Sequence, residues 1–296
     1  MDKKLVFHIT FHNQIEQLKF HLDTILSWKC SRDIDIVLTS AHRDNLTAIE
    51  TYCNAFYPDY DFDCVFIEED HGYHKGTLYN VNEGIKYINE YKDYDYIVNV
   101  EADNLFYDEN KFFDLLQKME SEDKHLLIVD WVTKGDSLYT NYPELPKYHS
   151  LSTLNIYSNY FINNHYPLDY YEDLMDLGWN RNPGTPFEDY LSMAFSKKHS
   201  LDTEDKVREY FKHWAYYLEY NIWWKLHPNN IECTELNYYD RDKQLFVCHC
   251  GKQLPQHFYF RDALTPERFT NYGLVLCTTD LQVTKNFINL YKPYLK

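Results

Sequence analysis

Alternating strand and helix patterns over the first 130 residues are the feature that most constrains the fold of this chain. Apolar runs rich in β-branched residues occur at 4–10, 33–39, 62–67, 94–100 and 126–129. The segments between them repeat apolar residues every three or four positions, the spacing of an amphipathic helix. The alternation predicts an α/β fold with a mostly parallel sheet and helices on both faces. Such sheets bind ligands at the carboxyl ends of their strands, so the residues that follow each strand are the candidates for chemistry. The expected helices span 14–29, 44–56, 75–90 and 110–120.

The second half of the chain, residues 131–260, has a mixed α/β pattern. Its last expected helix is long, because Val207, Phe211 and Leu218 share one helical face. No linker or repeat marks a boundary, so a single domain over 1–296 is expected, with 261–296 as a C-terminal extension. The expected strands of this half span 149–156 and 244–248, and the expected helices 159–165, 169–177, 187–197 and 202–224.

The charge of the chain restricts its partners. With 29 Lys and Arg against 46 Asp and Glu, the formal net charge is -17. Nonspecific binding to nucleic acid and docking on anionic membranes both need a basic footprint, so neither is expected. An anionic ligand would be met by a metal ion or by backbone N–H groups. The pattern does not set an oligomeric state.

Apolar segments and cysteines indicate a cytoplasmic protein. The first apolar run is too short for a signal peptide, and no run of 18 apolar residues would span a membrane. The seven cysteines form an odd, scattered set, which favours reduced thiols. Cys248-His249-Cys250 resembles part of a zinc site, but the spacing lacks the second pair of ligands that a tetrahedral site needs.

Glu101-Ala102-Asp103, directly after the fourth expected strand, is the main candidate for chemistry. Residues i and i+2 of an extended segment point to the same side, so both carboxylates can face one cation. Carboxylate oxygens suit Mg²⁺ or Mn²⁺, with a diphosphate completing the coordination. The alternative is a solvated strand end, since acid-x-acid triplets arise by chance in a chain this acidic. The place of the triplet, where such sheets bind ligands, favours the metal site.

Residues 74–84 form a second candidate. His74 and Lys75 precede Gly76, which opens the third expected helix, and Asn82 lies further along it. The free N–H groups at a helix start and the two basic side chains could meet phosphate or sugar oxygens. The alternative is an ordinary helix start with an exposed lysine.

Two further candidates lie in the second half. Glu188-Asp189 begins a helix after a loop rich in Gly and Pro. A carboxylate there could act as a general base for a hydroxyl, or could interact favourably with the helix dipole. His249 follows the strand at 244–248 and is a candidate nitrogen ligand for the metal, or else a buried histidine bonded to backbone.

Taken together, these residues resemble the GT-A glycosyltransferases, in particular the family 2-type group. The opening KLVFHITFHNQIEQLKFHLDTIL is similar to the first strand and helix of that family. Gly76, Asn82 and Gly84 match its spaced G…N-x-G pattern. Glu101-Ala102-Asp103 stands where its metal-binding DXD motif belongs, and Phe187-Glu188-Asp189-Tyr190 resembles its ED motif.

The resemblance implies a Rossmann-like sheet and a hexosyltransferase-like enzyme that uses Mn²⁺ or Mg²⁺. It would move a sugar from a nucleotide-diphosphate donor, a UDP-sugar as the first expectation, to a hydroxyl of a glycan or glycoconjugate, with inversion. The donor would bind in residues 1–130, and residues 131–260 would supply the acceptor and catalytic half. The resemblance implies that the base pocket is formed by Thr10, Phe11 and His12, and that the donor is also contacted by His74, Lys75, Gly76, Asn82 and Ala102. It implies that the metal is bound by Glu101, Asp103 and His249. It also implies that Asp189 is the catalytic base and that Glu188 orients the acceptor.

The sequence departs from the family in two places, and two other functions are open. The acid-rich stretch that follows the second strand in the family is Thr39-Ser40-Ala41-His42-Arg43-Asp44 here, with the acid displaced, and Glu101 stands where Asp is usual. A sugar nucleotidyltransferase needs a Gly-rich loop after the first strand, and Phe11-His12-Asn13 contains no Gly. A noncatalytic carbohydrate- or protein-binding module on the same fold would show no metal-dependent affinity for nucleotides.

Overall fold

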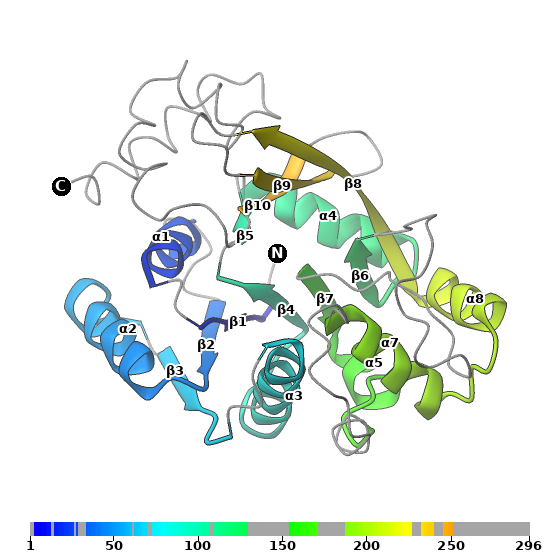
Figure 1. The fold of residues 1–296 in the computed structure, drawn as a ribbon, viewed down its shortest axis with the longest axis horizontal. Coiled ribbons are helices and arrows are strands. Elements are labelled where there is room, and N and C mark those ends of the chain that lie inside the picture. Colours follow the sequence, from blue (N-terminus) through cyan, green and yellow to red (C-terminus); the bar gives the residue numbers. More distant parts are fainter. Residues whose placement is uncertain are drawn as a thin grey trace. The chain divides into compact units, whose positions relative to one another are not determined.

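A computed structural model of the chain forms two compact units (Figure 1). The first unit combines 1–12, 32–101 and 118–217, and the second combines 13–31, 102–117 and 218–296. For residues 73–75, 187–190 and the described residues between 219 and 250, the structure describes the backbone but not the side chains. The expectation of a single domain stays a prediction. The described residues are 3–12, 15–26, 28, 34–60, 62–69, 73–102, 104–106, 109–129, 154–170, 187–226, 232–239 and 245–250.

The sheet of the first unit has the strand order β3-β2-β1-β4-β7-β6. β1 pairs in parallel with both β2 and β4, and β2 pairs in parallel with β3. β7 runs antiparallel to both β4 and β6. The predicted mostly parallel sheet is thus confirmed, with an antiparallel strand next to β4. The strands are β1 Leu5–Thr10, β2 Ile34–Ser40, β3 Phe62–Phe66, β4 Tyr96–Glu101, β6 Leu126–Val129 and β7 Leu154–Ser158.

Helices cover both faces of this sheet. From β1 the chain moves through β2 to the edge strand β3, and then returns across the sheet to β4 on the other side of β1. Right-handed crossovers place the helices of these two directions on opposite faces. α2 (Arg43–Phe56) contacts β2 and β3, whereas α3 (Tyr73–Tyr91) contacts β1 and β2. The reversal makes the carboxyl ends of β1 and β4 a topological switch point.

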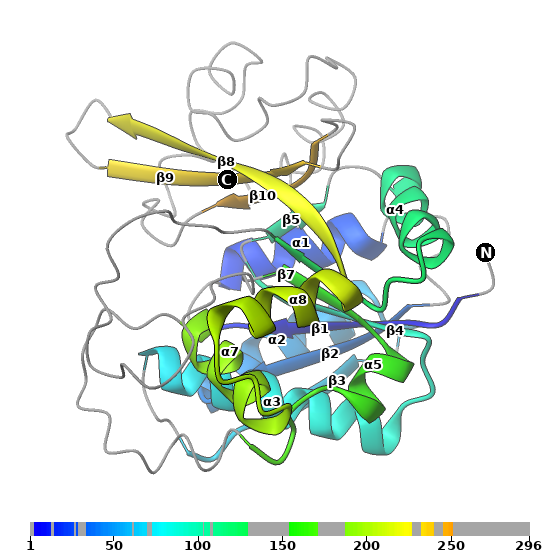
Figure 2. The ribbon, with the colours of Figure 1, turned by 90° about the vertical axis from the view of Figure 1, so that its right-hand side faces the viewer.

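The α3 face carries the main core of the first unit. Leu78, Val81, Ile85 and Ile88, spaced by three and four residues, are all buried against the sheet. α5 (Asn159–Asn164), α7 (Phe187–Lys198) and α8 (Glu204–Trp214) supply residues to the same cluster. α7 contacts α3 and lies beside it in Figure 2, whereas Figure 1 shows α8 further from α3 than α7. Burial of this face is the main source of stability here, at about 25 cal/mol per Å² of apolar surface removed from water.

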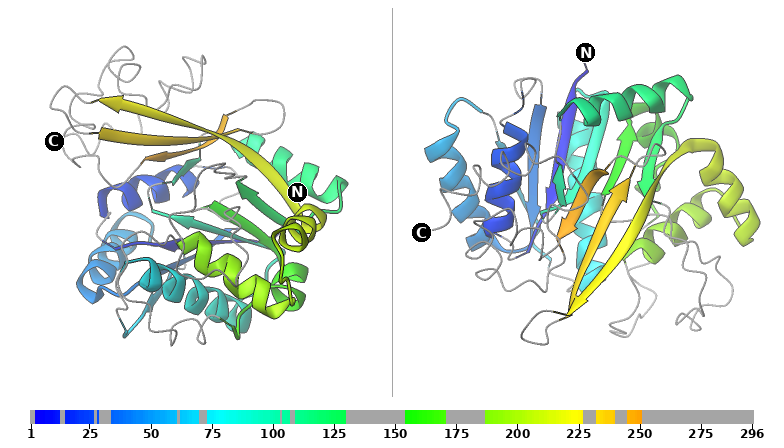
Figure 3. Two further views of the ribbon diagram at one scale, coloured as in Figure 1. Left: turned by 45° about the vertical axis from the view of Figure 1, so that its right-hand side comes forward. Right: turned by 90° about the horizontal axis from the view of Figure 1, so that it is seen from above.

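The second unit contains an antiparallel sheet in the order β8-β9-β10-β5. β8 (Ala215–Leu226) begins in the first unit and pairs with β9 (Glu232–Tyr239) over eight residues from Glu219 to Leu226. β9, β10 (Leu245–Cys250) and the short β5 (Asn104–Phe106) follow, and Figure 3 shows the long strands side by side. α1 (Ile15–Leu26) contacts β5. Trp28 packs against Phe112 of α4 (Glu109–Ser121) with ring centroids 5.3 Å apart.

The predicted helix over 202–224 is wrong in its second half. α8 ends at Trp214, and β8 begins at the next residue. The segment AYYLEYNIWWKL is rich in aromatic residues, which favour strands, and β9 offers it a hydrogen-bonding partner. Tertiary pairing therefore overrides the helical spacing that Val207 and Phe211 begin. The aromatic residues of 216–224 lie on a strand and not on a packed helix.

Other element boundaries differ by a few residues. Of the strand predicted at 149–156, residues 149–153 lie outside the described residues, and the rest belongs to β7, which extends to Ser158. The helix predicted to start at Lys75 starts at Tyr73. β5 and β9 were not predicted. Of the helix predicted at 169–177, residues 171–177 lie outside the described residues. Among the helices that the structure describes, none combines the length and the apolar composition needed to cross a membrane.

Candidate functional site

The carboxyl ends of β1 and β4 bring two predicted site residues together. Thr10, the last residue of β1, pairs in register with Glu101, the last residue of β4. Thr10 is buried, Glu101 is half-buried and Ala102 is buried. A carboxylate therefore stands at the switch point of the sheet, where doubly wound folds bind ligands. Asp103 lies outside the described residues.

The loops after β1 and β2 meet at the same edge. Phe11 is buried, and its N–H donates to the carbonyl oxygen of Thr39 over 3.2 Å. His12 is exposed and its ring contacts that of His42, with centroids 3.9 Å apart and a nitrogen of each ring in contact. Asn45 donates to the carbonyl oxygen of His12. His42 was not predicted as a site residue, although its place just after β2 was a signal that could have found it.

A row of buried polar side chains lies beneath this edge, on the α3 face. His8 of β1, Asn99 of β4 and Asn155 of β7 are paired in register and fully or almost fully buried. The Nε2 of His8 lies 3.0 Å from the Oγ1 of Thr39 on β2. Burial lowers the pKa of His8 to about 4, against an opposing effect of the Asn99 side chain. His8 is therefore neutral near pH 7.

The buried state of His8 makes the stability of the fold depend on pH. Its pKa falls from 6.5 to about 4 on folding, so the unfolded chain binds more protons between these values. Protonation of the unfolded chain at His8 therefore does not reduce the free energy of unfolding above about pH 6.5. Below that value it does, and the reduction grows as the pH falls toward 4. We expect His8 to account for about 3 kcal/mol of this loss. Urea unfolding at about pH 7.5 and about pH 4.5 measures it. The loss should be smaller in His8→Phe; an equal loss in both proteins would contradict the assignment.

α3 carries the second predicted group. Because α3 starts at Tyr73, His74, Lys75 and Gly76 lie in its first turn instead of before it, and Gly76 is buried. The side chains of His74 and Lys75 lie outside the description. Asn82 is fully buried, and its Nδ2 donates to the carbonyl oxygen of Leu78 over 2.8 Å, so it faces the core.

Within the second unit, strand pairing brings His249 next to β5. β10 runs antiparallel to β5, with His249 opposite Asn104, the residue after Asp103. His249 lies within β10 and not after a strand, because β10 extends to Cys250. Its side chain lies outside the description. The backbone register places His249 opposite Asn104 within the second unit.

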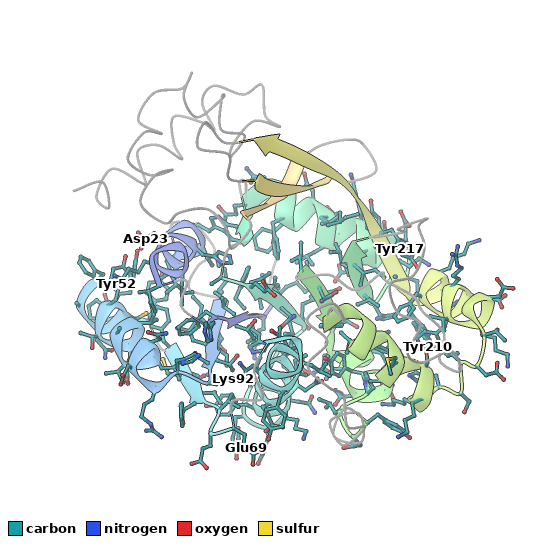
Figure 4. All side chains as sticks on the ribbon, viewed as in Figure 1. Asp23, Tyr52, Glu69, Lys92, Tyr210 and Tyr217 are labelled. Atoms are coloured by element: carbon teal, nitrogen blue, oxygen red, sulfur yellow. The ribbon has the colours of Figure 1, made fainter. Side chains whose placement is uncertain are left out.

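Glu188 and Asp189 are the second and third residues of α7, as predicted, and their side chains lie outside the description. The other end of α7 is tied to its neighbours. The Nε2 of His199 lies 2.8 Å from the carbonyl oxygen of His165 and 3.0 Å from the hydroxyl of Tyr210, which is labelled in Figure 4. Burial, and then the nearby His199, lower the pKa of His165 to about 4. α7 is thus held by neutral, hydrogen-bonded side chains.

Of the three predicted metal ligands, Glu101 has its side chain described by the structure. Glu101 offers carboxylate oxygens, the ligands that Mg²⁺ and Mn²⁺ prefer. Among the side chains that the structure describes, no three His, Cys, Asp or Glu residues gather closely enough to hold a metal. Two of the three predicted ligands, Asp103 and His249, lie outside that set. Among the described residues, Cys53 and Cys64 form no disulfide bond.

Three solved structures are similar to this chain. PcManGT, a mannosyltransferase from Pyrobaculum calidifontis in complex with GDP-Man and Mn²⁺, is 13% identical over 58% of this chain and 50% of its own, with a TM-score of 0.41. TarS 1-349 of S. aureus in complex with UDP is 14% identical over 65% and 55%, with a TM-score of 0.40. A protein named as a glucose-1-phosphate thymidylyltransferase from Bacillus anthracis is 12% identical over 74% and 88%, with a TM-score of 0.39.

The matched regions span about half the length of the first two of these proteins. PcManGT, whose name gives it as a mannosyltransferase, is one of the structures that this chain is similar to. No protein-family model matches the chain, and no curated protein matches it. The assignment of the α/β fold rests on the strand order and register of the chain itself.

Proposed function

We propose that this chain is a metal-dependent glycosyltransferase that moves a sugar from a nucleotide-diphosphate donor to an acceptor hydroxyl on a glycan or glycoconjugate. The observation that carries the proposal is the register of Thr10 with Glu101 at the switch point of the sheet. This register puts the first carboxylate of the acid-x-acid motif where doubly wound sheets bind ligands. The sequence resemblance to GT-A glycosyltransferases supports the same reading.

In this proposal the chain would hold the divalent metal ion that the donor diphosphate requires. Glu101 and Asp103 hold Mn²⁺ or Mg²⁺ through carboxylate oxygens, with His249 as a nitrogen ligand. When bound, the ion neutralises negative charge on the departing diphosphate. Thr10, Phe11 and His12 lie on the base side of the donor, and the first turn of α3 on the sugar or phosphate side. Asp189 would take the proton from the acceptor hydroxyl while the acceptor oxygen bonds to the anomeric carbon and the bond to the diphosphate breaks. This single displacement inverts that carbon, and Glu188 would orient the acceptor.

Calorimetric titration of UDP, GDP, CMP and dTDP into the full chain tests the proposal. Each nucleotide is titrated with Mn²⁺ and again with EDTA. We expect one diphosphate to bind only when the metal is present, which would also identify the donor class. Binding of none of them to folded protein would contradict the proposal and favour a noncatalytic module. UTP and dTTP are titrated in the same way, and binding of either in preference to every diphosphate would instead favour a sugar nucleotidyltransferase.

A further inference from the structure

We infer that His8 is a positioning residue for the candidate site. In its Nδ1-protonated neutral form it links the side chains of Thr39 and Asn99 across the switch point, and so holds the ends of β1 and β4 in register. The inference rests on the proposed function, because the site that it positions is the proposed nucleotide and metal site. His8 itself is buried and does not touch the ligand.

Strand alternation places His8 directly below the candidate site. Side chains two residues apart on a strand share a face, so His8 and Thr10 point the same way on β1. Asn99 and Glu101 do the same on β4. Both pairs are in register, His8 with Asn99 and Thr10 with Glu101. A polar layer therefore lies one step beneath the layer that carries the proposed metal ligand.

The hydrogen-bond partners around His8 indicate which of its ring nitrogens carries the proton. Among the described residues, neither the Nδ1 of His8 nor the Oδ1 of Asn99 makes a hydrogen bond, and both atoms are buried. A proton on Nε2 would leave two buried acceptors facing each other without a donor, at about 1–3 kcal/mol for each. A proton on Nδ1 lets His8 donate to Asn99 after a small side-chain movement. The hydroxyl of Thr39 then donates to the Nε2 of His8, 3.0 Å away.

Gly84 of α3 completes the arrangement. A Cβ atom built on Gly84 would lie 2.0 Å from the Nε2 of His8 and 2.4 Å from its Cε1. The imidazole therefore occupies the space that a side chain at this position of α3 would fill. It lies between the helix and the sheet and has little freedom to turn. Thr39, His8 and Asn99 thus couple three adjacent strands to one another, with α3 closing over them.

Loss of this side-chain link would affect the position of β4. β4 pairs with β1 on one side and with the antiparallel strand β7 on the other, so its register with β1 depends on the contacts between β1 and β4. Loss of the His8 contacts removes a side-chain link between β1 and β4 two residues before Glu101. Glu101 and Thr10 are then still present, but the distance between them is no longer fixed. Metal-dependent affinity should fall even though every proposed ligand is present, as happens when groups that orient metal ligands are removed.

The first test measures the tautomer of His8 and needs no activity. Two-bond ¹H–¹⁵N NMR correlations distinguish the protonated ring nitrogen from the unprotonated one, which resonates far downfield. The signals of His8 are those that disappear in His8→Gln. Near pH 7 we expect Nδ1 to be the protonated nitrogen. A neutral ring protonated on Nε2, or a ring with both nitrogens protonated, would overturn the inference.

The second test measures nucleotide affinity in His8→Phe, which keeps a ring beneath Gly84 but removes both hydrogen bonds. We expect Mn²⁺-dependent affinity for the diphosphate that the wild type binds to fall by about 10- to 100-fold. His8→Gln keeps a donor and an acceptor and should recover part of the loss. Val6→Ala, on the same strand and face, is the matched control for lost packing and should bind like the wild type.

The outcomes separate the inference from the proposed function. Wild-type protein that binds no nucleotide would overturn the proposed function, whatever the tautomer of His8. Wild-type protein that binds, with His8→Phe binding equally well, would overturn the inference alone. An equal loss of affinity in Val6→Ala would also overturn it, because the effect would then follow from core packing. Should His8→Phe fail to fold, Asn99→Leu removes the same hydrogen bond from the other strand, with the same expected loss.

Discussion

Glu101→Gln and Asp103→Asn are each expected to lower the Mn²⁺-dependent affinity for the donor diphosphate by at least about 100-fold, and to abolish transfer. Each change keeps the size of the side chain and removes one negative charge. A carboxamide oxygen is a weaker ligand for a hard cation than a carboxylate, and the metal contributes several kcal/mol to the stabilisation of diphosphate charge. Calorimetric titration of the nucleotide with Mn²⁺ and with EDTA measures the effect directly.

Asp93→Asn is the matched control for this experiment. Asp93 is exposed, pairs with Lys4 and lies three residues before β4, at the opposite end of the strand from Glu101. Its substitution makes the same change in charge, and exposed ion pairs contribute at most about 1 kcal/mol. Affinity for the nucleotide should not change. Equal losses in Asp93→Asn and Glu101→Gln would show that the effect is one of net charge, and the metal assignment would fail.

The parallel half of the sheet could be predicted because the sequence patterns that determine its strands and helices are local. β1, β2 and β4 are buried on both faces, so they read as almost continuous apolar runs. α3 has one buried face, which gives the spacing of Leu78, Val81, Ile85 and Ile88. Each of these signals lies within about twenty residues of sequence. The alternation of the two patterns then sufficed for the parallel sheet and for the edge at which to look for a site.

The antiparallel sheet of the second unit was not predictable in the same way. The apolar and aromatic residues of 215–226 fit a helix by spacing and a strand by composition. The partner that decides between them, β9, is the polar segment ECTELNYY, which carries little strand signal of its own. β5 has only three residues. Pairing between segments with weak individual signals becomes visible only in three dimensions.

The candidate site was predicted in part for a similar reason. Glu101 could be proposed from the sequence because the spacing of two acids after an apolar strand is a local pattern. The position of His42 just after β2 is also a local signal, but its contact with His12, 30 residues away in sequence, is visible only in the structure. Gly84 was recognised only as part of a motif, and its physical reason, the imidazole of His8, lies on another element. Contacts between strand ends and helices are set by the topology, which the sequence pattern does not specify residue by residue.

Gly84→Ala is expected to destabilise the fold by about 3 kcal/mol or more, at the upper end of what overpacking costs. In an ordinary helix the same change stabilises by about 1 kcal/mol, because glycine is a poor helix former. Here the new Cβ would lie 2.0 Å from the Nε2 of His8, which is itself fully buried between α3 and the sheet. Neither the ring nor the helix can give way without losing core contacts. Urea unfolding gives the free energy of unfolding of each variant.

The double variant His8→Ala/Gly84→Ala separates this contact from a general intolerance of α3. His8→Ala alone should destabilise the fold, because it leaves a cavity and the buried Asn99 without its ring neighbour. The alanine at 84 then enters the vacated space, so the double variant should be more stable than the sum of the two losses predicts, by about 2 kcal/mol. Val6→Ala/Gly84→Ala makes a cavity on the same face of β1, away from Gly84, and should show no such coupling. Additive losses in both double variants would mean that His8 does not fill the space beneath Gly84.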